Sequence, residues 1–235
     1  MQSVQRSCSI LGMCVLLLGA SFSSCKKEKT DPPPPKEVEV VDQEAEDTYV
    51  AFLNSDASWA NSIGDWAQEI AMDSWTNGGA LMGVRSYIKF DKISQIPKGS
   101  TILSAKLYLY PKGTSISALQ GNSGYPGSPY NGDNDCKIER VIGGDWDATT
   151  LTWNTQPAVS SAGAASIPAS NSQWDYAAEV DITDLVKAIT VDPSKNYGFR
   201  ISLVNESIYR SLIFASSENS NENLRPKLVV KYQEQ

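Results

Sequence analysis

The sequence predicts an all-β fold, an antiparallel two-sheet sandwich with one short helix, over residues 47–235. Short runs in which apolar and polar residues alternate indicate half-buried strands, and clusters of Gly, Pro, Asn and Ser separate these runs. The chain of 235 residues has 41% hydrophobic and 20% charged residues, which is typical of a globular protein. About ten short strands with a single helix favour two packed β-layers.

The strand predictions rest on a period of two. In residues 104–110, Ala105, Leu107 and Leu109 share one face while Lys106 takes the other. Similar patterns predict strands at residues 87–90, 199–203 and 228–232. Weaker patterns predict strands at residues 48–53, 68–72, 137–142, 151–153, 178–182 and 212–215.

One segment has helical periodicity instead. In residues 183–189, Leu185, Val186 and Ile189 form a single apolar face. Pro193 follows closely and cannot continue a helix, so the helix is predicted to end before it.

Residues 1–24 are predicted to be a lipoprotein signal peptide. Arg6 precedes an apolar run, and small residues then lead up to Cys25, which resembles a bacterial lipobox. The apolar run is shorter than the roughly 20 residues that cross a bilayer as a helix. Cys25 is therefore the predicted lipidation site, and an ordinary secretory signal is the alternative. Residues 25–46 are predicted to be the lipidated cysteine and a charged, proline-containing tether.

This leader predicts a location in the bacterial cell envelope, at the outer membrane, with membrane attachment through the lipid alone. Of the 4 cysteines, Cys136 alone would remain as a thiol in the mature chain, so no intrachain disulfide is expected. We expect a monomer that its core holds together.

Composition also excludes classes of function. The chain has 20 Lys and Arg against 27 Asp and Glu, a net charge of -7, which argues against a nucleic-acid partner. It contains no histidine, and this excludes Ser-His-Asp catalysis and His-ligated zinc. No catalytic residue is predicted, although a carboxylate glycosidase or a Tyr/Arg lyase remains an alternative.

An ordered series of motifs over residues 47–233 resembles the DNRLRE domain family. The series starts with RSYIKFD at residues 85–91, IPKGSTI at 96–102 and SAKLYL at 104–109. It continues with WDATTLTWNTQP at 146–157, DIT at 181–183 and NYGF at 196–199. It closes with FASSE at 214–218 and RPKLVVKY at 225–232.

This resemblance implies a jelly-roll sandwich on a secreted or surface protein. Related modules bind acidic polysaccharide such as alginate, and they often lie beside a lyase domain. The resemblance therefore implies a polysaccharide partner, for which an acidic polysaccharide is one example. The chain lacks an accompanying catalytic domain and has an insertion at residues 121–135. For this reason no ligand-binding residue is carried over from the family.

Aromatic residues are the candidate ligand contacts. Flat aromatic rings stack on the C–H faces of sugar rings, and Trp59, Trp66 and Trp75 lie in one polar, Gly-rich stretch. The insertion adds Tyr125 and Tyr130 in a composition that suits adaptable recognition, and Trp174 lies in a later loop. The alternative is that these rings only cover the open end of the sandwich, or belong to plain solvent loops.

No cofactor is predicted, although a structural calcium ion is an alternative. The weak candidates for its ligands are Asp133, Asp135 and Glu139. The sequence thus predicts a lipid-anchored, non-catalytic module that binds extracellular polysaccharide. A structural or adhesive surface module that binds a protein partner is the main alternative, since the same anchor and fold would serve it.

Overall fold

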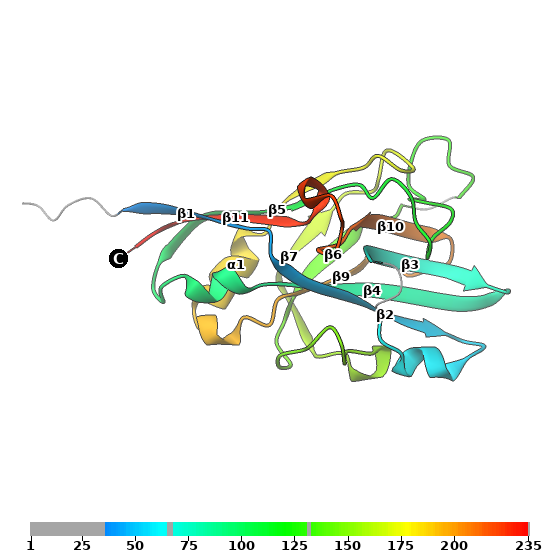
Figure 1. The fold of residues 1–235 in the computed structure, drawn as a ribbon, viewed down its shortest axis with the longest axis horizontal. Coiled ribbons are helices and arrows are strands. Elements are labelled where there is room, and N and C mark those ends of the chain that lie inside the picture. Colours follow the sequence, from blue (N-terminus) through cyan, green and yellow to red (C-terminus); the bar gives the residue numbers. More distant parts are fainter. Residues whose placement is uncertain (1–35, 65–67, 131–132, 235) are drawn as a thin grey trace, which may run out of the picture. The chain divides into compact units, whose positions relative to one another are not determined.

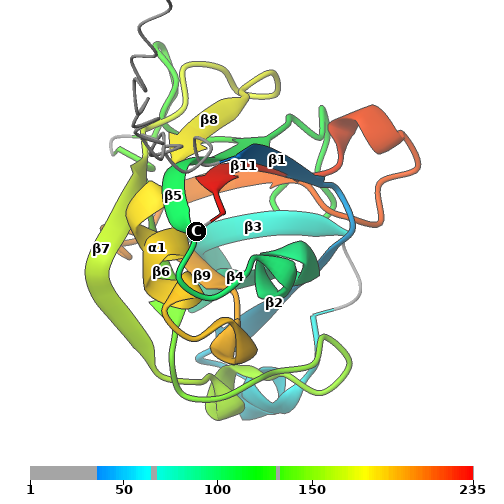
Figure 2. The same ribbon diagram turned by 90° about the vertical axis from the view of Figure 1, so that its left-hand side faces the viewer.

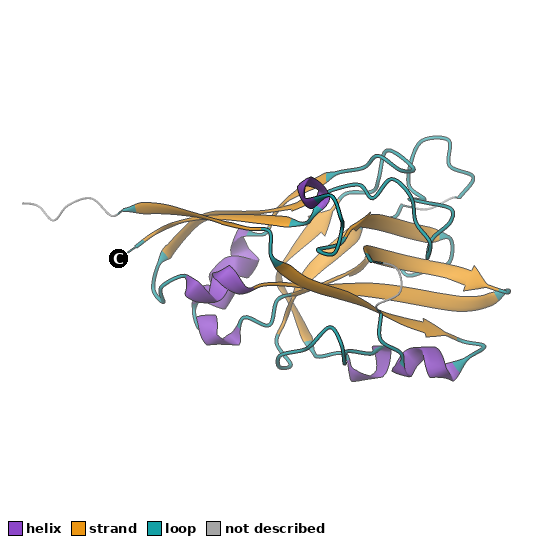
Figure 3. Ribbon diagram, viewed as in Figure 1, coloured by secondary structure: helices purple, strands orange, loops and turns teal. Residues whose placement is uncertain are grey.

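The predicted all-β sandwich is confirmed. The segments with alternating apolar and polar side chains form strands, and these strands pair into two antiparallel sheets. The computed structural model describes residues 36–64, 68–130 and 133–234, which belong to one compact unit. Strands are its main regular structure, with one α-helix and short 3₁₀ turns among the described residues (Figure 3). No helix among these residues is long and apolar enough to span a bilayer.

The smaller sheet brings the two ends of the described chain together. Its strands are, in order, β1 (Glu37–Asp42), β11 (Lys227–Gln233), β5 (Thr101–Leu109) and β8 (Ala178–Asp181). β1 and β11 are antiparallel, with Glu37 opposite Gln233 (Figure 1). The segment expected to be a tether up to residue 46 therefore contributes a strand. Val38 and Val40 alternate with glutamates and pack against the core.

The larger sheet has seven strands among the described residues. Six of them follow one another across the sheet, in the order β10 (Arg210–Ala215), β3 (Glu69–Asn77), β4 (Ala80–Phe90), β9 (Phe199–Leu203), β6 (Cys136–Val141) and β7 (Val159–Ile167). The seventh strand, β2 (Ala45–Leu53), pairs with β4.

The main core lies between the two sheets and is closed at one end by α1 (Thr183–Thr190). Its largest fully buried side chains include Phe90, Phe199, Phe214 and Leu107. In α1, the predicted apolar face is buried, and the helix contacts β5 and β7 (Figure 2). The Asp181 carboxylate accepts a hydrogen bond from the Thr183 N–H at 2.9 Å, which fixes the start of the helix.

Two strands share one edge of β4. β2 pairs with β4 along one edge from Met82 to Phe90, so β3 and β9 both use the other edge. β3 pairs with residues 80–84 and β9 with residues 86–88. At the change of partner, the buried Ser86 hydroxyl donates to the Ala71 carbonyl and accepts from the Ala71 N–H, both at 2.9 Å. The Ser86 side chain thus replaces the two backbone hydrogen bonds that Ala71 would otherwise make to a neighbouring strand.

The structure differs from the strand predictions in several places, and β4 begins at Ala80 instead of the predicted residue 87. Residues 151–153 are not a strand, and Trp153 instead begins the 3₁₀ turn η3 (Trp153–Thr155), whose backbone is held by Thr152 and Thr155. β7 has no apolar alternation in Ser160–Ala164 and was not expected. β3 extends beyond the predicted Met72 to Asn77, so that Trp75 lies on a strand.

We expect Ser86→Ala to lower the free energy of unfolding by about 2–6 kcal/mol, because it leaves two backbone groups of buried Ala71 unpaired at about 1–3 kcal/mol each. Urea denaturation of residues 36–235 measures the effect. Ser161→Ala on β7 is the control, since Ser161 is exposed and its loss should change stability by less than about 0.5 kcal/mol. Equal effects of the two substitutions would contradict the role of Ser86 where β4 changes its partner from β3 to β9.

Reducing agent should leave the melting temperature of residues 36–235 unchanged. The one cysteine in this segment, Cys136, is a buried free thiol, and burial raises its pKa well above the usual value. Thermal melts with and without dithiothreitol check this expectation, and a marked fall in the melting temperature would show a disulfide between chains.

Candidate functional site

One face of β2, β4 and β3 carries a continuous apolar surface. Pairing places Ala51, Val84 and Asp73 in one row across the three strands. The next row is Leu53, Met82 and Trp75. Residues paired in an antiparallel sheet project from the same face, so the two rows lie side by side. We call the buried apolar members of this face the floor: Tyr49, Ala51, Leu53, Ala71, Met82 and Val84.

A tryptophan packs against the floor from each side. Trp75 projects from β3, and Trp59 comes from η1 (Ala57–Asn61), the 3₁₀ turn after β2. Asp56 fixes this turn by accepting hydrogen bonds from the Ser58 N–H at 2.9 Å and the Ser58 hydroxyl at 2.6 Å, and these bonds lower the pKa of Asp56. Two strand spacings separate β2 from β3, or about 10 Å. The two half-buried rings thus flank the same floor.

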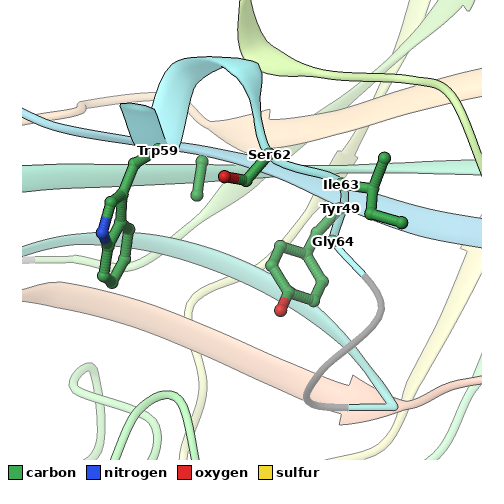
Figure 4. Close-up of a pocket in the computed structure, with 6 residues that line it drawn as sticks. Tyr49, Trp59, Ser62, Ile63 and Gly64 are labelled. Carbon is green, nitrogen blue, oxygen red and sulfur yellow. The ribbon is translucent and has the colours of Figure 1, made fainter. Parts of the chain in front are cut away.

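The first hollow, of about 410 Å³, lies between Trp59 and Tyr49. Their rings project from η1 and β2 in the same direction, side by side (Figure 4). Ala51, Ser62, Ile63 and Gly64 complete its lining. Gly64 is required here, because a Cβ at this position would lie 1.9 Å from the Tyr49 carbonyl oxygen. The predicted candidate Trp66 lies outside the described residues.

The second hollow, of about 550 Å³, lies on the other side of the floor, and Trp75, Tyr130 and Asp73 line it. The Trp75 ring meets Tyr130 edge-on at 4.5 Å between centroids, and Tyr209 edge-on at 5.2 Å. Tyr130 and Tyr209 stack at 6.2 Å. Tyr209 has a φ of 68°, a strained value for a residue other than glycine, of a kind that clusters at functional sites.

Asp73 is the polar centre of the second hollow. Its side chain is buried, and its Oδ1 has no hydrogen-bond partner among the described residues. Burial, and secondarily the charge of Glu69, raise the pKa of Asp73 to about 8. Gln120, which lines the same hollow, likewise has a buried Nε2 without a partner in the part of the chain described. This hollow therefore contains polar atoms that can bond to a ligand.

Glu69 lies further along β3 and belongs to a closed cluster. Its carboxylate is fully buried and accepts hydrogen bonds from the Lys112 ammonium and the Ser115 hydroxyl, both at 2.9 Å. The Ser117 hydroxyl also donates to it. These bonds hold the segment after β5 against β3, and Ser117 in turn lines the second hollow.

The structure separates the remaining aromatic candidates from these hollows. Trp174 packs over Gly121, where an added Cβ would lie 2.9 Å from its ring. Tyr125 begins a turn in which its carbonyl accepts a hydrogen bond from the Ser128 N–H at 3.0 Å. Neither residue lines the first or the second hollow. Of the predicted aromatic residues, Trp59, Trp75 and Tyr130 share one face.

The insertion at residues 121–135 has a structural role besides supplying Tyr130. Asn122 and Ser123 hydrogen-bond to the backbone of Ser211 and Ile213, and so cover the outer edge of β10. An uncovered edge strand would expose unpaired backbone groups. Residues 121–135 are therefore not only a solvent loop, which was the alternative from the sequence, because part of this segment covers the edge of β10.

The suggested calcium ligands are not brought together as a metal site. Glu139 is buried and pairs with Arg200 at 2.7 Å and with Lys137 at 3.5 Å. Asp133 is exposed, and the Asp135 carbonyl accepts a backbone hydrogen bond from Val204. The described residues contain no group of three or more acidic, Cys or His side chains that could hold a metal.

The opposite face of the sheet is filled by packing. The Trp146 indole N–H donates to the Tyr197 carbonyl at 2.8 Å, and Trp153 packs against Phe52 at 4.6 Å. Arg85 covers the Trp153 ring and makes two bonds to Glu206, at 2.7 and 2.8 Å, which lower the pKa of Glu206. The cation of Arg85 on this face is thus paired with the Glu206 carboxylate and stacked on the Trp153 ring.

Sequence reasoning missed Tyr49, Asp73 and Tyr209. Tyr49 could have been found, because it shares a period-two face with Ala51 and Leu53. Finding Asp73 would have required knowing that β3 continues to Asn77. Nothing in the local sequence marks Tyr209.

An apolar floor, flanking aromatic rings and a few buried polar atoms suit the C–H faces and hydroxyls of sugar rings. Comparison with protein families matches residues 40–232 to carbohydrate-binding module family 96. No curated protein sequence matches the chain. The matched segment spans most of the chain and includes the floor, both tryptophans and both hollows. The chain belongs to carbohydrate-binding module family 96.

Proposed function

We propose that the protein is a lipid-anchored component of the bacterial cell envelope whose β-sandwich binds polysaccharide outside the cell without cleaving it. The observation that carries the binding role is the pair Trp59 and Trp75 on one apolar floor, each beside a hollow. Membership of a carbohydrate-binding family supports the same role. A chain of sugars that crosses the floor could contact both rings, since Trp59 and Trp75 pack against the same floor.

The anchor is proposed from the sequence. An apolar run followed by small residues and Cys25 is the pattern that lipoprotein processing requires, and two or more acyl chains hold a protein stably at a membrane. Cys25 lies outside the described residues. The outer membrane is the location we propose.

A protein partner is the second candidate. Ile116 and Leu119 on the segment after β5 are 63% and 79% exposed, next to the second hollow. Exposed apolar side chains beside a hollow favour contact with another protein surface. In that case the floor would bind an apolar peptide instead of sugar.

Trp59→Ala and Trp75→Ala are each expected to weaken polysaccharide binding by about 2 kcal/mol, or roughly 30-fold, because each removes an aromatic anchor. Affinity gel electrophoresis of residues 36–235 against soluble polysaccharides measures the loss.

The matched control is Trp153→Ala, on the opposite face, with folding of every variant checked by its thermal melt. Binding should survive in this variant. Retention by no polysaccharide, together with capture of peptides that depends on Ile116 and Leu119, would favour the protein partner.

Cys25→Ser is expected to move the full-length protein from the membrane fraction to the soluble fraction, because serine offers no sulfur for lipid transfer. Cell fractionation followed by mass spectrometry of the mature amino terminus measures this change. Cys136→Ser is the control and should leave the distribution unchanged. A Cys25→Ser protein that stays with the membrane would rule out this anchor.

A further inference from the structure

We propose that the polysaccharide bound on this face is uncharged, and that Asp73 selects it by donating a hydrogen bond in the second hollow. This inference rests on the proposed function and names the class of its ligand. It differs from the acidic polysaccharide that the sequence resemblance offers as an example.

Neither hollow offers a cation to an acidic sugar. No Lys or Arg lines the first or the second hollow among the described residues. Residues 65–67 and 131–132, which the structure does not describe, contain none in the sequence. Lys112 comes close to this face on the segment after β5, but it is bonded to Glu69 at 2.9 Å. The whole chain is also acidic, with a net charge of -7.

Arg85 and Arg200 are directed elsewhere. Val84 belongs to the floor, so the next residue on β4, Arg85, projects from the opposite face, where it pairs with Glu206. Arg200 pairs with buried Glu139 at 2.7 Å. A uronate carboxylate in the hollows would lose its hydration without gaining a counter-charge, at a cost of several kcal/mol.

The groups around Asp73 favour its neutral form. The charge of Glu69, on the same face of β3, raises the pKa of Asp73 even though Glu69 pairs with Lys112. The residues paired with Asp73 are Val84 on β4 and Ser211 on β10, neither of which carries a charge. Tyr130 faces the same hollow from the insertion. Among the described residues, no Lys or Arg lines this hollow that could hold an Asp73 carboxylate.

A neutral carboxyl group has a donor that a carboxylate lacks. With a pKa of about 8, Asp73 is mostly protonated at neutral pH and can donate through its hydroxyl while the other oxygen accepts. Sugar hydroxyls both donate and accept, so an uncharged sugar satisfies this group and the nearby Gln120 amide. As pH rises through 8 the donor is lost, and a buried charge appears in its place.

The test compares neutral polysaccharides (mannan, xyloglucan and mixed-linkage β-glucan) with the uronic-acid polymers alginate and pectin. Affinity gels and calorimetry are run with residues 36–235 between about pH 6 and pH 9.5, at low and high salt. We expect a neutral polymer to bind with little effect of salt. Its affinity should fall by up to about tenfold for each pH unit above about 8, because one proton is lost.

Three variants assign the pH effect. Asp73→Asn keeps the shape and a donor but cannot ionise, so binding at pH 7 should persist and its pH dependence should vanish. Asp73→Leu should lose binding at every pH. The matched control is Asp47→Asn, because Asp47 is also buried, with a pKa raised mainly by burial to about 7, but does not line either hollow. It should keep the fall in affinity above pH 8.

The outcomes separate this inference from the proposed function. Binding of alginate or pectin that salt weakens and that Trp59→Ala and Trp75→Ala abolish would overturn the inference and leave polysaccharide binding intact. Binding of a neutral polymer with the same pH profile in wild type and Asp73→Asn would overturn the role of Asp73. Binding of none of the five polymers would overturn the proposed function, and the inference with it.

Discussion

The candidate binding face depends on how Ser86 bridges a break in the sheet. β4 has only two edges, and β2 occupies one of them, so β3 and β9 must divide the other. A change of partner within a strand normally leaves backbone groups unpaired, which is costly in a buried position. The Ser86 hydroxyl removes this cost by bonding to both backbone groups of Ala71. β3 can then separate from β9 and keep Asp73 and Trp75 beside Val84 and Met82 of β4.

The change of strand partner at Ser86 also separates the floor from the main core. Two segments, η1 and the segment after β5, border the floor as its rims. Met82 and Val84, which precede Ser86 on β4, belong to the floor, while Ile88 and Phe90, which follow it, fill the main core. η1 and the segment after β5 lie on either side of the floor. Asp56 fixes η1 by accepting a hydrogen bond from the Ser58 N–H, and Glu69 fixes the segment after β5 by accepting one from the Ser115 hydroxyl. Ordered rims let the rings keep their positions before a ligand arrives, which lowers the entropic cost of binding.

Much of the fold could be predicted because alternating side chains leave a clear signal. Residues 199–203 coincide with β9, and the predicted helix is one residue shorter than α1. β7 left no such signal, because small residues fill it and most of them are exposed. Residues 151–153 looked like a strand, but Thr152 and Thr155 bond to each other and close a turn there.

The candidate site was predictable only in part. Composition led to Trp59, Trp75 and Tyr130, but their placement on a single face follows from pairing between strands distant in sequence, which a local pattern does not contain. For the same reason, Trp174 and Tyr125 looked equivalent to them. The unusual proton affinity of Asp73 depends on burial and on Glu69, and neither can be read from neighbouring residues.

The pairing of β1 with β11 determines where the module is attached. Glu37 lies opposite Gln233, so the chain enters and leaves the folded unit at one end, while η1 lies at the other end (Figure 1). A polymer lying across the floor therefore does not compete for space with the chain that enters at β1. In the proposed lipid-anchored protein, the anchor would then be joined to the end of the module that lies away from the candidate site.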